Sequence, residues 1–233
     1  EEIGMGAEHF NLDQFGAEYA YTLDGDSEGE IQYENFNACK AEFEIRGFNV
    51  HPGEGKDTMI NASLVAMEIN SCLPSMETPR GTEDYEGFYH LISMQGEVGE
   101  AKLNYIVRDH DKNGFEERKK TLRLIEKNLN AKWGEGTVTL KITDQYLNMK
   151  EIVEEHMHLI DHAKKACEAA GVAPLILPIR GGTDGCQLSF KGLPCPNLGT
   201  GGHAFHGPYE HISVEGMEKS VELLLALIQE YTK

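Results

Sequence analysis

The middle of this 233-residue chain changes its apolar periodicity in a fixed order, and this order limits the fold more than any other feature. Apolar residues either alternate, as in half-buried strands, or recur every three or four positions, as on one face of a helix. The segments read strand, helix, strand, strand, helix and strand over residues 41–48, 57–73, 87–96, 101–111, 113–129 and 136–143. This order predicts the split-βαβ, ferredoxin-like unit, a sheet with helices on one face. Its other face is left open for a partner.

The segments on either side have a different character. Residues 1–36 open with a stretch rich in glycine and acidic side chains, and residues 148–233 alternate helix and strand. We expect a helix over about 151–170, a short buried strand in "APLILPI" and another near "PCPNL". Alternating strands and helices indicate a parallel α/β sheet. The prediction is therefore an α/β domain built from residues 1–36 and 148–233, with a ferredoxin-like (βαββαβ) domain inserted at 37–147.

The last helix is expected to begin after Ser213, because serine is a preferred N-cap residue. Helical spacing then predicts that its buried side chains are Met217, Val221, Leu224, Leu225 and Ile228.

Composition excludes several classes of protein. The formal net charge of −18 argues against binding nucleic acid or an anionic membrane, whose phosphates would be repelled. The sequence has no run of about 18 apolar residues, so no transmembrane helix is predicted. Its five cysteines are widely spaced, without the C-x-x-C pattern of a structural zinc site, which favours reduced thiols in a cytoplasmic protein.

Carboxylates suited to metal chemistry stand near the N-terminus. Of the adjacent pair Glu1 and Glu2, one side chain could bind a cation while the other takes a proton from the metal-bound water. Asp24 follows an apolar pair and precedes Gly25, as would a ligand at the end of a strand. Taken alone, the pair also fits an ordinary acidic terminus and Asp24 fits an Asx turn.

Histidines and arginines supply the other candidates. His206 lies in a glycine-rich loop with His203, and neutral imidazole is the commonest metal ligand. His51 precedes Pro52 at the end of a strand, which also fits a surface loop. Arg108, on a strand, and Arg180, at the edge of a buried strand, could grip a carboxylate with two hydrogen bonds, although Arg108 could equally pair with a nearby aspartate.

Each of these signals is weak, but their joint order is specific. The motifs are "EEIG", "YTLDGD", "FNVHPG", "YEGFYHL", "YIVRDHD", "PIRGGTDG", "GLPCPN" and "FHGPYEHIS". Together they resemble the co-catalytic zinc exopeptidases, and within that family the tripeptide aminopeptidases, along the whole chain. The family also has an upstream H-x-D strand and an aspartate that bridges the metals, and neither motif occurs here. The resemblance therefore implies the C-terminal part of a longer enzyme.

The resemblance implies a role for each candidate in a site with two zinc ions. Glu1 matches the general base that deprotonates the bridging water. Glu2 and His206 match ligands of one zinc, and Asp24 matches a ligand of the other. His203 falls where the pattern requires no histidine, and we expect it to be a loop residue or to support a ligand.

The inserted domain is implied to be a lid. His51 matches the lid histidine that stabilises the oxyanion, and Arg108 and Arg180 match positions that face the carboxylate end of a peptide. The expected function is release of the N-terminal residue of tripeptides in the cytoplasm, with a small peptide as substrate and a possible homodimer through the lid. The chain alone is expected to be inactive. Alternatives are a carboxypeptidase or N-acyl amino acid deacylase of the same family, and a catalytically silent assembly module.

Overall fold

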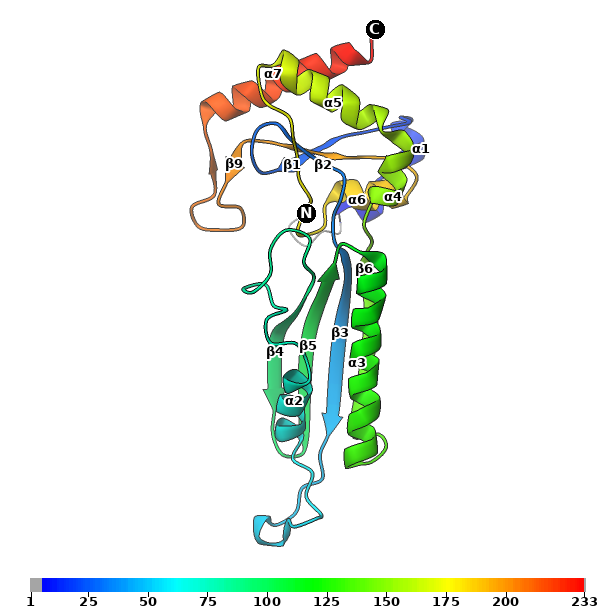
Figure 1. Ribbon diagram of the computed structural model, residues 1–233, viewed down its shortest axis with the longest axis vertical. Coiled ribbons are helices and arrows are strands. Elements are labelled where there is room, and N and C mark those ends of the chain that lie inside the picture. The colour runs from blue at the N-terminus through cyan, green and yellow to red at the C-terminus, as the bar shows by residue number, and fades with distance from the viewer. Residues whose placement is uncertain (1–5, 233) are drawn as a thin grey trace. The chain divides into compact units, whose positions relative to one another are not determined.

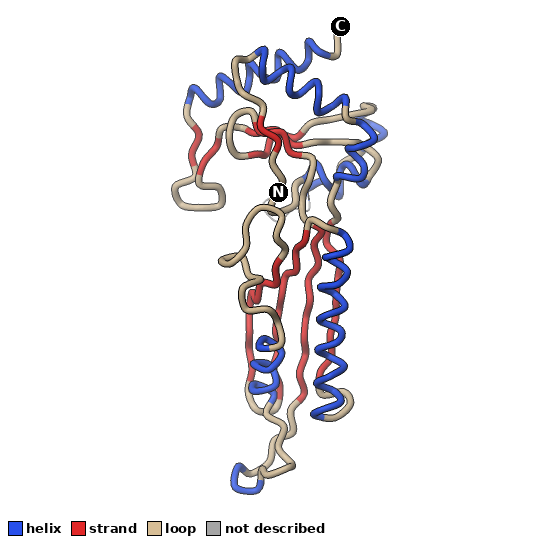
Figure 2. Tube along the Cα trace, viewed as in Figure 1, coloured by secondary structure: helices blue, strands red, loops and turns tan. Residues whose placement is uncertain are grey.

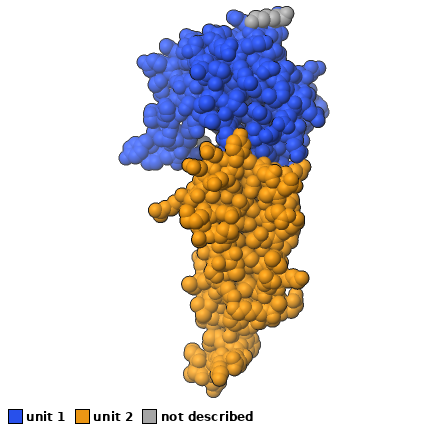
Figure 3. Space-filling model, viewed as in Figure 1, with its two compact units in different colours: residues 1–35, 147–233 blue, residues 36–146 orange. Residues whose placement is uncertain are grey.

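The computed structural model describes residues 6–232 of the chain. The chain divides into two compact units, which Figure 3 shows in different colours. Unit 1 consists of Glu1–Asn35 and Leu147–Lys233, and unit 2 consists of Phe36–Tyr146. The second unit is therefore inserted between two segments of the first.

Unit 2 has the predicted order of elements (Figure 1). Its antiparallel sheet has the strand order β4-β5-β3-β6, and two helices connect the strands. The elements are β3 (Asn37–Arg46), the short 3-10 helix η2 (Pro52–Glu54), α2 (Ala62–Ser71), β4 (Phe88–Gly96), β5 (Glu100–Asp109), α3 (Lys112–Trp133) and β6 (Val138–Tyr146). The ferredoxin-like βαββαβ prediction is confirmed.

Both helices of unit 2 pack on the same face of its sheet. Alternate residues of β3, such as Phe43 and Ile45, are buried in one apolar cluster with Ile69 of α2 and Leu122 of α3. The strands alternate because successive side chains point to opposite faces. The caps explain where α3 begins: the Asp111 carboxylate accepts a hydrogen bond from the Gly114 N–H at 2.6 Å.

Unit 1 contains two small sheets (Figure 2). The larger has the strand order β1-β8-β2-β7, with β1 (Thr22–Gly25), β2 (Glu30–Gln32), β7 (Leu175–Ile176) and β8 (Asn197–Gly199). The β1–β8 and β2–β7 pairs are parallel, but β2 and β8 are antiparallel. The expected parallel sheet is therefore mixed. The second sheet is the hairpin of β9 (Gly202–His203) and β10 (His211–Ile212).

The helices of unit 1 are mostly short. They are η1 (Gly6–His9), α1 (Leu12–Phe15), α4 (Lys150–Val153), η3 (Glu154–His156), α5 (His158–Ala169), α6 (Asp184–Phe190) and α7 (Val214–Glu230). The single helix expected over 151–170 is interrupted by the 3-10 turn η3. Of the described helices, none is long and apolar enough to cross a lipid bilayer.

The start of α7 agrees with the prediction, but its buried face does not. The Ser213 hydroxyl accepts a hydrogen bond from the Gly216 N–H at 2.9 Å, which caps the helix. The buried leucines are Leu223 and Leu227, each 4% exposed. The predicted core residues Met217, Val221, Leu225 and Ile228 are exposed, and Leu224 is half-buried. The helix has two apolar sides, and packing against α5 decides which of them is covered.

The strand expected in "APLILPI" also differs from the prediction, which was a buried strand. It is only two residues long, and Leu175 and Ile176 are exposed by 47% and 38%. The reason is its place in the fold: β7 is the last strand of its sheet and pairs only with β2 among the described strands.

Candidate functional site

The candidate ligand Asp24 lies on β1 of unit 1. This strand runs parallel to β8, with Gly25 opposite Gly199. A Cβ atom on Gly25 would lie 2.9 Å from the Gly199 Cα. The two strands could therefore not approach as closely with a larger residue at position 25. Asp24 is exposed one position before this contact. It thus stands at the carboxyl end of its strand, where open α/β sheets bind ligands.

A buried network of hydrogen-bonded polar side chains holds this part of the sheet together. The Asn197 amide donates to the Gln32 Oε1 at 2.6 Å, and the Gln32 amide donates to the Glu30 carboxylate at 2.9 Å. The Asn197 Oδ1 accepts a hydrogen bond from the Thr22 hydroxyl at 3.0 Å. Asn197 is completely buried, so its hydrogen bonds link β1, β8 and β2 in the interior, where hydrogen bonds are stronger than in water. Sequence reasoning missed these residues, although Asn197 follows a buried apolar run.

His206 lies in the loop between β9 and β10 with a strained backbone. Its φ angle is 58°, in the left-handed region that side chains with a Cβ atom rarely adopt. Its N–H donates to the Glu210 carboxylate at 2.8 Å, which fixes this conformation. The side chain of His206 is exposed. Strain of this kind is commonest where function requires one side-chain direction.

His203 has a different environment from His206. It lies on β9 opposite His211 of β10, and the two imidazole centroids are 5.3 Å apart. The His211 Nδ1 is 2.7 Å from the Tyr209 carbonyl oxygen. A carbonyl can only accept, so the proton of the neutral His211 ring lies on Nδ1. His203 is therefore one half of a cross-strand pair.

Arg180 follows a short bridge at the edge of the larger sheet of unit 1. Ile179 pairs with Asn35, and its N–H donates to the Glu34 carbonyl oxygen at 2.7 Å. Three residues after Arg180, the Thr183 hydroxyl caps α6 by accepting from the Cys186 N–H at 3.2 Å. Arg180 itself is half-buried. Its backbone is thus anchored on both sides.

In unit 2, His51 has a defined tautomer. Its Nδ1 accepts a hydrogen bond from the Gly53 N–H at 3.2 Å. A neutral imidazole that accepts at Nδ1 carries its proton at Nε2. The side chain is exposed, so Nε2–H can donate to a group outside the unit.

Arg108 is held by its own unit. It is 9% exposed, and its Nη1 donates to the Val107 carbonyl at 3.1 Å and to the Gln145 Oε1 at 3.2 Å. Its guanidinium also lies 5.1 Å from the centroid of the Tyr146 ring. These contacts use only part of the five N–H donors of an arginine.

The end of β5 beside Arg108 is fixed by an ion pair that sequence reasoning did not identify. Arg118 of α3 donates from Nε to the Asp109 carboxylate at 2.7 Å and from Nη1 to the Glu77 carboxylate. Burial by itself would lower the pKa of Arg118, but the hydrogen bonds to Asp109 and Glu77 outweigh it and raise this pKa above its ordinary value. Asp109, which the sequence suggested as a possible partner of Arg108, thus pairs with Arg118.

The predicted metal site is not assembled within the described residues. Glu1 and Glu2 lie outside them. Residues 6–232 contain no group of three or more His, Cys, Asp or Glu side chains that could hold a metal ion. Asp24 and His206 are ligand types that zinc accepts, but two ligands are fewer than a catalytic zinc needs.

Comparison with known proteins shows what the inserted unit and the chain are similar to. Residues 33–137 match the family of the peptidase dimerisation domain. Over all 233 residues the chain is 55% identical to peptidase T of Clostridium perfringens. The chain is related to peptidase T along its whole length. It spans 57% of the length of that relative.

Solved structures agree with this relation at the level of the fold. The aminopeptidase PepT of Bacillus cereus has a TM-score of 0.85 at 24% identity, over 100% of this chain and 62% of that one. A tripeptidase of Staphylococcus aureus has a TM-score of 0.84 at 19% identity, over 98% and 61%. A dinuclear metal-binding peptidase of Bacillus subtilis has a TM-score of 0.69 at 17% identity, over 98% and 62%. The chain thus shares its fold with these three structures over almost its whole length.

Proposed function

We propose that the enzyme containing this chain is a metal-dependent aminopeptidase that releases the N-terminal residue of tripeptides. The observation that carries the proposal is the 55% identity to peptidase T over all 233 residues. The peptidases named among the structural neighbours support the same reaction class. The five cysteines are free thiols, which supports the reducing cytoplasm as the compartment of this enzyme.

Two zinc ions are proposed as the cofactor, with Asp24 and His206 among their ligands and Glu2 as a further ligand. When bound, zinc lowers the pKa of a coordinated water and polarises a carbonyl group. Glu1 is proposed as the base. A dinuclear site in one structural neighbour supports the metal count.

His51 is proposed to donate its Nε2 proton to the oxyanion that forms on the peptide carbonyl. The hydrogen bond from Gly53 leaves the proton on the outward nitrogen, which is the donor this role needs. As a hydrogen-bond donor at Nε2, the ring would stabilise the oxyanion through a directed N–H···O contact.

Arg180 and Arg108 are proposed to bind the carboxylate of the substrate. A guanidinium can form two parallel hydrogen bonds with a carboxylate, which would favour peptides whose C-terminus lies at a fixed distance from the cleaved bond. Arg180 is half-buried between two anchored segments, and Arg108 also donates a hydrogen bond to Gln145.

Unit 2 is proposed to form a homodimer through β4 and α2. β4 is an edge of the sheet and exposes Ile92 and Met94, while α2 exposes Leu64 and Met67. An exposed strand edge with apolar side chains pairs readily with another chain. The match to the peptidase dimerisation domain supports a second copy as the partner.

The test is an assay of the gene product that carries this sequence, loaded with zinc. A tripeptide should release its first residue, whereas a tripeptide blocked at the amino group should not react. The tripeptide amide should react at least tenfold more slowly, because it lacks the carboxylate that arginine would bind. Faster cleavage of an N-acyl amino acid would favour the deacylase. Inactivity towards all of these would favour an assembly module.

A further inference from the structure

The loop between β9 and β10 places the candidate ligand His206 in an unfavourable backbone conformation. The ladder of this hairpin ends at the pair His203 and His211, so residues 204–210 form the loop. Both Ala204 and His206 have φ angles of 58°. A left-handed residue with a Cβ atom costs free energy and persists only where surrounding contacts hold it. The contacts that hold this loop therefore decide where His206 points.

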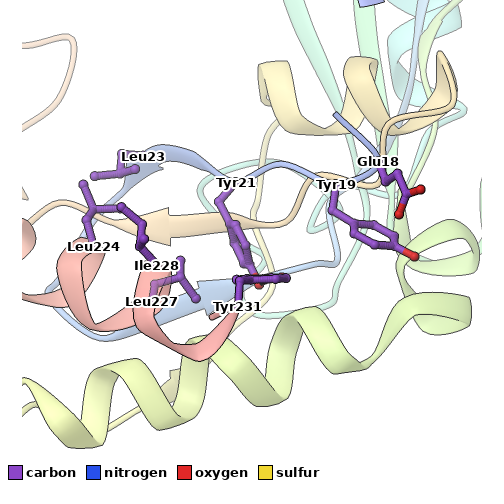
Figure 4. Close-up of a pocket in the computed structure, with 8 residues that line it drawn as sticks. All are labelled: Glu18, Tyr19, Tyr21, Leu23, Leu224, Leu227, Ile228 and Tyr231. Atoms are coloured by element: carbon purple, nitrogen blue, oxygen red, sulfur yellow. Dashed lines mark hydrogen bonds between the residues drawn. The ribbon is translucent and has the colours of Figure 1, made fainter. Parts of the chain in front are cut away.

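Both ends of the hairpin are attached to the rest of unit 1. At the β8 end, the N–H and the hydroxyl of Thr200 both donate to the Gly25 carbonyl, at 3.1 and 3.0 Å. At the α7 end, the Ser220 hydroxyl donates to the Thr200 carbonyl at 2.8 Å. The end of α7 is held to the start of β1 by Tyr231 and Tyr21, whose hydroxyl groups lie 2.8 Å apart (Figure 4). The frame of the hairpin is thus fixed.

Three contacts within the loop fold it but leave His206 itself aside. The Phe205 ring lies close over β9, since a Cβ atom on Gly202 would lie 2.5 Å from this ring. The Gly207 N–H donates to the Ala204 carbonyl at 3.1 Å, and the Glu210 N–H donates to the Gly207 carbonyl at 3.2 Å. These bonds form two successive turns on either side of Gly207.

The Glu210 carboxylate makes the contact at His206. It accepts a hydrogen bond from the His206 N–H at 2.8 Å. Within residues 6–232 this carboxylate has no other hydrogen-bond or ion-pair partner. Glu210 directly precedes β10, so the ladder fixes its backbone. A hydrogen bond to a carboxylate is stronger than one between neutral groups. It can therefore offset the cost of the left-handed conformation at His206.

We infer that Glu210 is a positioning residue for the metal ligand His206. Its carboxylate holds the φ angle of His206 and so sets the direction in which the imidazole leaves the loop. The ligand then needs no change of backbone conformation when the metal binds. Residues that orient a ligand contribute about 10–100-fold to metal affinity. The inference rests on the proposed role of His206 as a zinc ligand.

The test is zinc binding by the gene product that carries this sequence, measured by competition with a chromophoric chelator. Glu210→Ala should raise the dissociation constant of one zinc ion about tenfold or more. Glu210→Gln should bind zinc as the unaltered protein does, because its amide oxygen can accept the same hydrogen bond. The matched control is Glu218→Ala on α7, which also removes one exposed carboxylate and should leave zinc binding unchanged.

Amide exchange gives a second readout that needs no metal. In the zinc-free protein, the His206 N–H should exchange with solvent faster in Glu210→Ala than in Glu210→Gln, because only the second variant keeps its acceptor. Zinc binding by Glu210→Ala equal to that of the unaltered protein would overturn the inference. Equal weakening by both variants would also overturn it and would show that Glu210 acts through its charge.

Failure of the proposed function is recognised separately. An unaltered protein that binds zinc but releases no amino acid would contradict the proposed reaction and leave the comparison of variants in force. An unaltered protein that binds no zinc would overturn the proposed cofactor and the inference together, before any variant is compared.

Discussion

At the scale of single residues, the loop between β9 and β10 distinguishes two histidines that lie three positions apart. His206 has a φ angle of 58°, which costs about 1–2 kcal/mol for a residue with a Cβ atom. His203 lies on the two-residue strand β9, and its imidazole is tilted against that of His211. The strained residue is the one whose motif matches a metal ligand, and the unstrained one has a structural neighbour. Backbone geometry thus supports different roles for the two side chains.

We predict that replacing His206 removes metal from the zinc-loaded enzyme and replacing His203 does not. The variants are His206→Asn and His203→Asn, since asparagine tolerates a positive φ angle and preserves the loop. Metal analysis of both purified proteins should show the loss of about one zinc per chain in the first alone, because a three-ligand site tolerates no vacancy well. Loss of zinc in the His203→Asn protein alone would contradict the assignment.

We predict that Asn197→Ala lowers the free energy of unfolding by about 1–3 kcal/mol, the cost of leaving buried polar partners without hydrogen bonds. The partners are Gln32 and Thr22. Urea denaturation measures the change. The control is Gln229→Ala on the exposed side of α7, which should change stability by less than about 0.5 kcal/mol. If Asn197→Ala changed the free energy of unfolding equally little, the network of polar side chains around Asn197 would not stabilise the sheet.

At the scale of elements, the edges of the two main sheets differ in how much backbone they present. β4 is nine residues long, whereas β7 has two. Pairing through β4 can therefore form a long ladder, and β7 can add only one or two hydrogen bonds. A long edge with apolar side chains is the better candidate for a stable contact between chains.

We predict that Ile92→Lys on β4 converts the proposed dimer into a monomer. A lysine on an edge strand opposes pairing, and Ile92 is 56% exposed, so the fold of the monomer should tolerate it. Sedimentation equilibrium measures the mass of each protein. Met67→Lys on α2 should act in the same direction, and Leu124→Lys on α3 should not. A dimer that persists in both Ile92→Lys and Met67→Lys would move the interface elsewhere.

At the scale of the whole molecule, the two units differ in the regularity of their sheets. Unit 2 has four strands of nine or ten residues in one antiparallel sheet, with a continuous apolar cluster beneath two helices. The described strands of unit 1 have two to four residues. Long ladders over a closed core open less readily than short ones.

We therefore predict stronger protection from hydrogen exchange in residues 41–146 than in residues 148–200. Exchange of the 233-residue chain followed by mass spectrometry measures both segments in one sample. Protection should extend over β3, β5 and α3, which hold most of the buried apolar side chains of unit 2. Equal protection of the two segments, or a reversed order, would contradict the prediction.

The order of elements in unit 2 and the cap of α7 could be predicted from local sequence patterns. Alternation and helical spacing are local properties, set by which side chains share a face, and Ser213 caps α7 through a neighbour three residues away. The candidate site residues came from the order of short motifs. Their roles stay predictions, because Glu1 and Glu2 lie outside the described residues and no metal cluster is assembled in the remainder.

Local patterns could not predict which side of α7 is covered, how β2 and β8 are oriented or which side chains Asn197 bonds. Each of these depends on segments far apart in the chain: α7 packs on α5, and Asn197 of β8 reaches Gln32 of β2. Periodicity shows that a helix has apolar faces, but it carries no information about which neighbour covers each one. The choice is made by burial and hydrogen bonding between distant elements, and for this reason the exposed apolar side of α7 could be recognised only in the folded chain.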